Sequence, residues 1–564
     1  MLCNESGDSD KTPLLTFRAL LSSSKIDDRD SFINIWESKD TSDFLLFSVG
    51  PSTSIIETEN KLHDFHVKYS SKAQGECLNN GFMLPNNTCV CPPYFTQSDC
   101  SQMTCLNSGI QATNFRCSCP PGYIGRFCEQ MGCMAAFDSE FDFKKRSFVI
   151  VLNIIRDASF MITTVQSTVN NLLQSRAGHY NNFILSTYYM NSQLSNYFSY
   201  TSITTNFTVF QNQLSSVYAN KDGQNKKQPT LSAINSALTK QSQITPKSDI
   251  YVFTLSPPSD YSTTDPYTES STSAESILSR TVINWGHSVY TILGQSALSP
   301  FNETDPAINA FKNIAAISNG EFIYVASRTS DAARAFQSIF ALNLYPETVA
   351  SQRNFNCSTP VSVSIVNGAY DTGIFIYTSG IGITVTYNGA ALTANATYGD
   401  FQVFNQGYSD SRATITIGGS TACSYRIFTS SLESVIPGFA ATTQVDISKS
   451  YPSAYIPVFP VARIVSSSPP NLLHFYAVSQ SGDALLADGG EAQNARSDCN
   501  FPFQFQSWNC SERAFFSKFT YTESSGTTTR MIPSVCFTPS KNDVIVKVDI
   551  INPFQFIVIL LISH

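Results

Sequence analysis

The sequence predicts a multidomain protein that joins small disulfide-rich repeats, an α/β domain of Rossmann-like architecture and C-terminal all-β sandwich domains. Three observations predict this fold class. The chain has 564 residues, enough for about four domains of ordinary size. Cysteines between residues 77 and 128 recur with a fixed period. Strand-like and helix-like segments alternate over 144–345, and short strands with glycine and asparagine turns follow them.

Composition excludes several classes of protein. Charged residues make up 14% of the chain, against about 25% in an average soluble protein, while hydrophobic residues reach 42% and aromatic residues 12%. A disordered scaffold needs high charge and few aromatic residues, so it is excluded. The formal net charge is -8, and the longest basic cluster is Lys226-Lys227 near Lys221, which reads as a solvated loop. We therefore expect no nucleic-acid partner. The ligand that we expect instead is an extracellular protein or a glycan.

Cysteines and glycosylation sequons indicate an oxidising compartment. Fifteen cysteines are present, and most of them fall in tight spacings that are typical of a disulfide framework. Seven N-x-S/T triplets without proline are predicted acceptors of N-linked glycans, most of them on exposed loops. They begin at Asn4, Asn86, Asn206, Asn302, Asn356, Asn395 and Asn509.

The two ends fit secretion less simply. Met1 to Leu21 lacks the basic stretch and apolar core of a signal peptide, so we expect the start of the chain to be missing or mis-assigned. Phe556 to Ile562 is an uninterrupted apolar run, but a membrane span needs about 20 such residues. The expected localisation is extracellular, with no signal peptide and no membrane span in this chain.

The cysteine repeat occupies residues 77–130. The four cysteine positions of its first unit recur in the second with a period of 28, and both units contain C-x-C-P-P. The cysteines are Cys77, Cys89, Cys91 and Cys100, then Cys105, Cys117, Cys119 and Cys128. Units this small cannot bury a useful core, so covalent bonds replace it. A zinc site is the alternative, but the spacing is not that of zinc fingers.

These units resemble truncated EGF-like modules. The ending C-x-C-P-P-G-Y-x-G-x-x-C at Cys117 to Cys128 is highly specific for that family. The family pairs six cysteines first–third, second–fourth and fifth–sixth, and both members of the first–third pair are absent here. The resemblance therefore implies the bonds Cys77–Cys89, Cys91–Cys100, Cys105–Cys117 and Cys119–Cys128. The acidic pair and asparagine of calcium-binding modules are not rebuilt by Gln74 and Glu76, so we expect no calcium.

The α/β domain starts at a continuous apolar run, Ser147 to Leu152. Such β-branched runs are typical of a strand buried on both faces. Further strands are predicted at 182–189, 249–255, 288–293 and 321–326, and helices at 158–174, 207–218, 230–240, 274–285, 307–318 and 330–344. This alternation predicts a mostly parallel sheet covered on both faces.

Residues 144–345 resemble the von Willebrand factor A domain. The most telling part is the tail: the helix FKNIAAISNG, the strand EFIYVA and a helix beginning TSDAARAF. The resemblance implies a protein-binding face. In that family it also implies a divalent cation at the carboxyl ends of the strands, held by an Asp-x-Ser-x-Ser loop, a threonine and an aspartate.

That ligand set is degraded here. The loop after the first strand reads Asn153-Ile154-Ile155-Arg156-Asp157. Where the family has Thr-Asp after its fourth strand, the strand predicted at 249–255 runs into Thr254-Leu255-Ser256. Isoleucine cannot coordinate a hard cation, and arginine adds positive charge. We expect no metal and no cofactor. The alternative is a weak site made of Asp157, Ser159 and Thr230, although a threonine at a helix start is more often an N-cap.

The flanking regions are predicted from strand spacing. Residues 350–430 read as a β-sandwich whose ends Cys357 and Cys423 could join, 435–555 as a second β-rich domain, and 1–76 as a partial or unassigned segment. Fifteen is an odd number, so at least one cysteine is free or bonded outside the chain. Pairing stays open for Cys3, Cys133, Cys499, Cys510 and Cys536.

No catalytic motif is present. The chain has six histidines, of which His63 and His66 are spaced to bind metal only if helical, and it lacks G-x-S-x-G, H-E-x-x-H and a phosphate-binding glycine loop. We therefore predict a secreted, non-enzymatic adhesion or recognition protein. The module arrangement resembles large extracellular proteins of nematodes, some linked to infection response and innate immunity. The alternatives are a structural matrix or cuticle component and, less favoured, a secreted hydrolase.

Overall fold

A computed structural model describes most of residues 145–539 and shorter stretches elsewhere. The gaps inside that span are 192–196, 221–226, 239–243, 246, 270, 296–300, 303, 326–329, 343–344, 367–371, 408–411, 432–433, 441–449, 466–472, 483, 493–501, 511–512 and 524–525. Outside it, the structure describes 30–37, 45–52, 82–83, 89–90, 95–105, 109–111, 117–119, 123–124, 127–128, 130–131, 544–552 and 555–562. The chain divides into two compact units, Met1–Thr104 with Pro539–His564, and Cys105–Thr538.

The α/β part of the larger unit is built on a six-stranded sheet in the order β13-β12-β11-β14-β15-β16. Its strands are β11 (Arg146–Asn153), β12 (Tyr180–Met190), β13 (Tyr197–Thr204), β14 (Asp249–Thr254), β15 (Ser288–Gly294) and β16 (Phe322–Val325). All neighbours pair in parallel except β12 and β13. The five parallel strands lie where the sequence predicts them. The antiparallel β13 was not predicted, because an edge strand with a partly exposed pattern carries no buried apolar run.

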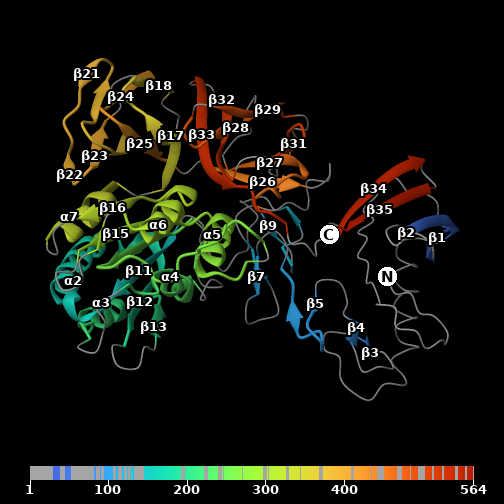
Figure 1. The fold of residues 1–564 in the computed structure, drawn as a ribbon, viewed down its shortest axis with the longest axis horizontal. Helices are drawn as coiled ribbons and strands as arrows, with labels where there is room; N and C mark the ends of the chain where they lie inside the picture. Colours follow the sequence, from blue (N-terminus) through green and yellow to red (C-terminus); the bar gives the residue numbers. More distant parts are fainter. Residues whose placement is uncertain are drawn as a thin grey trace. The chain divides into compact units, whose positions relative to one another are not determined.

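Helices cover both faces of this sheet (Figure 1). They are α2 (Ser159–Gln174), α3 (Phe207–Ser215), α4 (Thr230–Leu238), α5 (Ala274–Trp285), α6 (Pro306–Ile317) and α7 (Ser330–Leu342), with the 3-10 turns η2 (Arg156–Ala158) and η3 (Ala177–His179). Residues of β11 alternate between two cores. Phe148 and Ile150 pack with α2, α3 and α7, whereas Val149 and Val151 pack with α4, α5 and α6. A strand buried on both faces explains the continuous apolar run in its sequence.

A β-sandwich follows. Its sheets have the orders β17-β25-β19-β23-β22 and β18-β24-β20-β21. The strands are β17 (Pro346–Asn356), β18 (Val361–Val366), β19 (Thr372–Ser379), β20 (Thr384–Tyr387), β21 (Ala390–Ala391), β22 (Ala396–Tyr398), β23 (Phe401–Gln406), β24 (Arg412–Gly418) and β25 (Ala422–Ser430). The predicted strand at 381–387 begins only at Thr384, because Gly380 and Gly382 adopt positive φ in a turn.

The second β-rich region forms two further sheets. One contains β26 (Ser434–Ala440), β27 (Pro457–Val465), β30 (Pro502–Gln504) and β31 (Trp508–Asn509). The other contains β28 (Leu473–Ser479), β29 (Leu485–Glu491), β32 (Ala514–Glu523) and β33 (Gly526–Val535). Their facing side chains, Phe475, Phe505 and Phe519 among them, make a core of their own. Cys510 is bonded to Cys536, one of the pairings that sequence spacing left open.

The last two strands differ from the predicted domain limits. Strands β34 (Val544–Asn552) and β35 (Gln555–Ile562) belong to the smaller unit, in a four-stranded sheet with β1 (Asp30–Glu37) and β2 (Leu45–Ser52). The strands predicted near 43–49 and 544–550 are present as β2 and β34, and each of them pairs with β35. Strand pairing is non-local, so spacing along the chain could not show it.

The strands in the described residues of the cysteine repeat are all two residues long, as expected of units without a core. They are β3 (Phe82–Met83), β4 (Cys89–Val90), β5 (Phe95–Thr96), β6 (Gln102–Met103), β7 (Ile110–Gln111), β8 (Cys117–Ser118), β9 (Tyr123–Ile124) and β10 (Gln130–Met131). They pair as antiparallel hairpins in chain order. Cys105 is bonded to Cys117 and Cys119 to Cys128, the pairs that the resemblance implies.

Buried polar contacts join the α/β domain to the β-sandwich. The Arg353 guanidinium donates to both carboxylate oxygens of Glu321, at 2.7 and 3.0 Å. Arg426 is fully buried and donates to the Tyr290 hydroxyl at 3.1 Å and to the main-chain carbonyl of Asn319. A buried charge must be hydrogen-bonded to persist, so these contacts fix the two domains against each other.

Candidate functional site

The carboxyl edge of the parallel sheet is where the cation site implied by the family resemblance would lie. Strand β11 ends at Asn153, and the chain then turns through η2 into α2. Asn153 and Ile155 are fully buried, whereas Arg156 is exposed. The Asn153 amide lies 3.5 Å from the main-chain carbonyl of Tyr188, at the limit of a hydrogen bond. This turn therefore packs as part of the core and offers no carboxylate or hydroxyl at its buried positions.

A tyrosine holds the centre of this edge. The Tyr188 hydroxyl lies 2.9 Å from the Thr230 hydroxyl, and the Thr254 hydroxyl is a second hydrogen-bonding neighbour. All three residues are fully buried. Burial raises the pKa of Tyr188, so its hydroxyl stays neutral. The threonine that sequence analysis singled out is thus bonded to a phenol contributed by β12.

We call Tyr188, Thr230 and Thr254 the tyrosine layer. Hydrogen bonds connect the neighbouring loops to it. The Gln228 side-chain oxygen accepts the main-chain N–H of Met190 at 2.8 Å, and the Gln228 carbonyl accepts the Thr230 hydroxyl at 3.3 Å. Gln228 also forms a bridge to Pro258. The loops that follow β12 and β14 and precede α4 are therefore held as one layer.

A carboxylate that sequence analysis did not single out lies beside Thr230. Asp260 accepts the main-chain N–H groups of Leu231 and Ser232 at 3.2 and 2.6 Å, so it caps the start of α4. Burial raises the pKa of this carboxyl group, and the hydrogen bonds oppose that shift. Asp260 lies six residues after the end of β14, whereas the family motif places its aspartate directly after the strand. For this reason the sequence motif did not point to Asp260.

These residues do not fit a hard divalent cation. Thr230 is engaged with Tyr188 and Gln228, Ser159 is exposed on α2, and Asp157 lies in the η2 turn. Within the described part of the chain, no group of three or more His, Cys, Asp or Glu side chains could hold a metal ion. A magnesium or calcium site needs several converging carboxylate and hydroxyl oxygens, which this edge does not supply.

Exposed aromatic side chains surround the same edge. Phe160 follows β11 in the first turn of α2 and is 55% exposed. Phe198 and Tyr200 lie on β13 opposite the carboxyl half of β12, and Phe198 stacks on Tyr189 at 5.2 Å. Tyr218 is 77% exposed, next to the segment whose Asn220 N–H donates to the Ile154 carbonyl. We call Phe160, Phe198, Tyr200 and Tyr218 the aromatic edge.

Concentration at one place distinguishes the aromatic edge from scattered surface residues. Five aromatic side chains are strongly exposed among the described residues, and only Tyr455 lies outside it. Tyr189, Val217 and Ala219, which flank the edge, pack against the core on the α2 and α3 side of the sheet. Aromatic residues grouped on a supported surface are typical of protein or glycan recognition.

The remaining predicted sites are distributed over the surface and the β domains. Cys357, which follows β17, is bonded to Cys423 on the neighbouring strand β25, and Cys100 is also disulfide-bonded. The sequon asparagines Asn206, Asn302, Asn356, Asn395 and Asn509 are all exposed. Asn4, Asn86, Cys3, Cys77, Cys91, Cys133, Cys499, His63 and His66, and the side chain of Cys89, lie outside the described residues.

No described helix is both long enough and apolar enough to cross a lipid bilayer.

Comparison with solved structures finds distant similarity only. The pilus adhesin SpaC of Lactobacillus rhamnosus GG aligns at 12% identity and a TM-score of 0.27, over 70% of this chain and 56% of that one. A β-glucuronidase of Bifidobacterium dentium aligns at 7% identity and a TM-score of 0.15, over 34% of this chain and 40% of the enzyme. The chain thus spans about half the length of the adhesin it matches.

No curated protein matches the chain. The family profile described as von Willebrand factor A domain matches residues 147–327, which contain the parallel sheet, its tyrosine layer and the aromatic edge. The strand order, the helices on both faces and this match agree with the resemblance seen in the sequence. Residues 147–327 of this chain are therefore a von Willebrand factor A domain.

Proposed function

We propose that this chain is an extracellular, non-enzymatic adhesion or recognition protein that binds its partner through the aromatic edge of its von Willebrand factor A domain, without a divalent cation. The observation that carries the proposal is the pairing of two features at one sheet edge. The Tyr188–Thr230 hydrogen bond occupies the centre, and exposed aromatic side chains surround it.

The chemistry of this edge favours apolar and stacking contacts. Tyrosine and phenylalanine bury large areas at low entropic cost, and a tyrosine hydroxyl can still bond a polar group of the partner. Of the described charged residues at this edge, Arg156 is exposed and Asp260 accepts from main-chain N–H groups of helix α4. A protein surface or the faces of sugar rings fit such a patch, whereas a ligand recognised through a bound cation does not.

Extracellular placement is supported by the disulfides and the sequons. Four disulfides have both partners described: two lie within the repeat, one within the sandwich and one within the second β region. Such bonds persist in oxidising compartments. The five described sequon asparagines are accessible to glycosylation, and truncated EGF-like modules at 77–130 complete the architecture that we propose. A role in innate immunity, as in the nematode proteins that the arrangement resembles, is part of the same hypothesis.

The test measures adhesion of the intact chain to immobilised extracellular matrix by biolayer interferometry in EDTA. We expect binding to persist in EDTA and to weaken at least tenfold in the double variant Tyr200→Ser/Tyr218→Ser. The matched control is Tyr455→Ser, because Tyr455 is 70% exposed but lies away from the edge. Binding that EDTA abolishes, or that the double variant leaves unchanged, contradicts the proposal, and the second outcome favours a passive structural component.

A further inference from the structure

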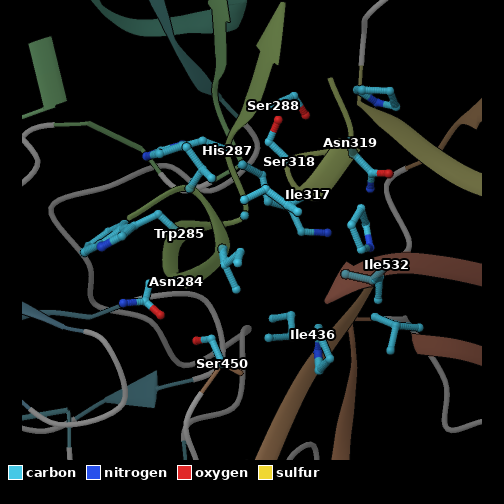
Figure 2. A pocket seen from close by; sticks show the side chains of 18 of the residues that line it. Asn284, Trp285, His287, Ser288, Ile317, Ser318, Asn319, Ile436, Ser450 and Ile532 are labelled. Carbon is cyan, nitrogen blue, oxygen red and sulfur yellow. The ribbon is translucent and has the colours of Figure 1, made fainter. Parts of the chain in front are cut away.

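A cavity of about 110 Å³ lies at the opposite, amino edge of the same sheet. It lies where β14 and β15 begin, where α5 and α6 end, and where β26 and β33 of the second β region approach. Figure 2 shows Asn284, Trp285 and His287 on one side of it and Ile436 and Ile532 on the other. We call this space the amino-edge cavity. It is separate from the aromatic edge, since the two lie at opposite ends of the parallel strands.

Much of the wall is apolar. Val282 and Ile317 come from α5 and α6, and Ile436 and Ile532 come from β26 and β33. These side chains originate from two different parts of the larger unit, the α/β domain and the second β region, so the cavity exists only in the assembled fold. Apolar walls joined by a few polar groups are typical of small-molecule sites, which often lie between domains.

Lys247 supplies positive charge. Its ammonium lies 2.9 Å from the Glu347 carboxylate, and both side chains are mostly buried, at 24% and 9% exposure. Burial lowers the pKa of Lys247 and Glu347 opposes that shift. An ammonium has three N–H donors, and the described residues engage one of them through Glu347. Arg146 also lines the cavity, so its lining carries one more cation than carboxylates.

His287 belongs to the same wall, with a fully buried ring. The Ser248 main-chain N–H points at His287 Nδ1 at 3.3 Å, which places the ring proton on Nε2 in the neutral form. Burial lowers the pKa of His287 to about 3, so the ring is neutral at physiological pH. His287 is fully buried, and its Nε2 has no hydrogen-bond partner among the described residues. A buried donor without a partner is costly, and such groups need an explanation.

The wall is rigid on its other side. Asn319, which ends α6, accepts the Thr348 hydroxyl through its side chain at 3.3 Å and the Arg426 guanidinium through its main-chain carbonyl. Gly320 permits the close approach there, because a β-carbon would clash with the backbone of Val289. A fixed wall lowers the entropic cost of binding, since little is ordered when a ligand enters.

We propose that the amino-edge cavity binds a small monocarboxylate with a compact apolar body. The carboxylate accepts from the Lys247 ammonium, beside its contact with Glu347, and the body contacts the isoleucine and valine walls. A water needs about 10–15 Å³ of such volume, so the cavity holds about seven to eleven water-sized groups. Benzoate falls in this size range and serves as the probe.

The experiment titrates benzoate, neutral benzamide and cationic benzylamine into the intact chain by isothermal calorimetry. We expect saturable benzoate binding, at least tenfold weaker benzamide binding and no benzylamine binding. Of the three compounds, only benzoate carries the negative charge that pairs with the Lys247 ammonium. Equal affinity for benzoate and benzamide, or no saturable binding of benzoate, overturns the proposal.

Two variants locate the site. Lys247→Met/Glu347→Gln removes the ion pair without leaving a buried charge unpaired, and it should weaken benzoate at least tenfold while leaving benzamide unchanged. Ile436→Trp fills the cavity and should abolish binding of both compounds. The matched control is Lys518→Met, because Lys518 is a half-buried lysine whose ammonium lies over the Tyr476 ring, outside the cavity. Benzoate affinity unchanged by Ile436→Trp in a folded chain places the ligand elsewhere and refutes the assignment.

Discussion

The tyrosine layer makes a quantitative prediction for Tyr188→Phe, which keeps the ring and removes only the hydroxyl. Two threonine hydroxyls lose a partner, but Thr230 keeps its bond to the Gln228 carbonyl and Thr254 keeps its 3.0 Å bond to the Ser256 carbonyl. No buried hydroxyl is left wholly unpaired. We therefore expect the free energy of unfolding to fall by about 1 kcal/mol, the ordinary net value of one buried hydrogen bond, rather than by 3 kcal/mol or so.

Unfolding of the unmodified chain and of Tyr188→Phe with added cations tests whether the carboxyl edge of the sheet binds Mg²⁺ or Ca²⁺. A site that bound Mg²⁺ or Ca²⁺ would stabilise the fold by about 2.7 kcal/mol at one hundred times its Kd. We expect neither the unmodified chain nor Tyr188→Phe to gain more than about 0.3 kcal/mol in 10 mM of either cation.

The assay is urea denaturation with and without MgCl₂ or CaCl₂, and Tyr455→Phe serves as the exposed control, with a change below about 0.5 kcal/mol. A gain above about 1 kcal/mol in the unmodified chain, or an unchanged stability in Tyr188→Phe, would refute the reasoning.

Three further perturbations test the amino edge and the β domains. Burial raises the pKa of the Asp249 carboxyl group from 3.8 to about 7, and the positive charges of Arg426 and Arg146 oppose that shift. The protonated carboxyl group therefore contributes its full stability below about pH 4, and this contribution is lost as the pH rises through 7. In Asp249→Asn, the urea midpoint should depend less on pH between about pH 4 and 7 than it does in the unmodified chain. An unchanged pH dependence contradicts this prediction. Arg426→Met leaves the Asn319 carbonyl without its buried donor, so unfolding free energy should fall by about 3–5 kcal/mol; a loss below about 1 kcal/mol argues against a buried charge. Cys510→Ser opens a loop of 26 residues and should cost about 3.5 kcal/mol in non-reducing denaturation, whereas equal stability with and without the bond would exclude that role.

Local sequence carried much of the fold. The run at Ser147 to Leu152 predicted a strand buried on both faces because every side chain in it is apolar or small, and β11 is buried throughout that stretch. The stop signal Asn319-Gly320 predicted the end of α6, since Asn319 takes a positive φ that few other residues adopt. Edge strand β13 escaped prediction because half-exposed strands lack such a run.

The candidate site was only partly predictable. The degraded loop at Asn153 to Asp157 indicated that a cation would be poorly held, and Thr230 was correctly placed at a helix start. The phenol that engages Thr230 lies 42 residues earlier in the chain, on a strand whose sequence reads as ordinary core. Nothing in the local pattern of β12 separates Tyr188 from its neighbours.

By itself, the sequence determined most strands and helices of the α/β domain and the disulfides Cys105–Cys117 and Cys119–Cys128, because backbone preference, apolar periodicity and cysteine spacing act over a few residues. Only the tertiary structure decided which distant groups meet: Tyr188 with Thr230, Cys510 with Cys536, and β35 with β2. Those meetings depend on strand register and domain packing, whose free energies are summed over contacts far apart in the chain.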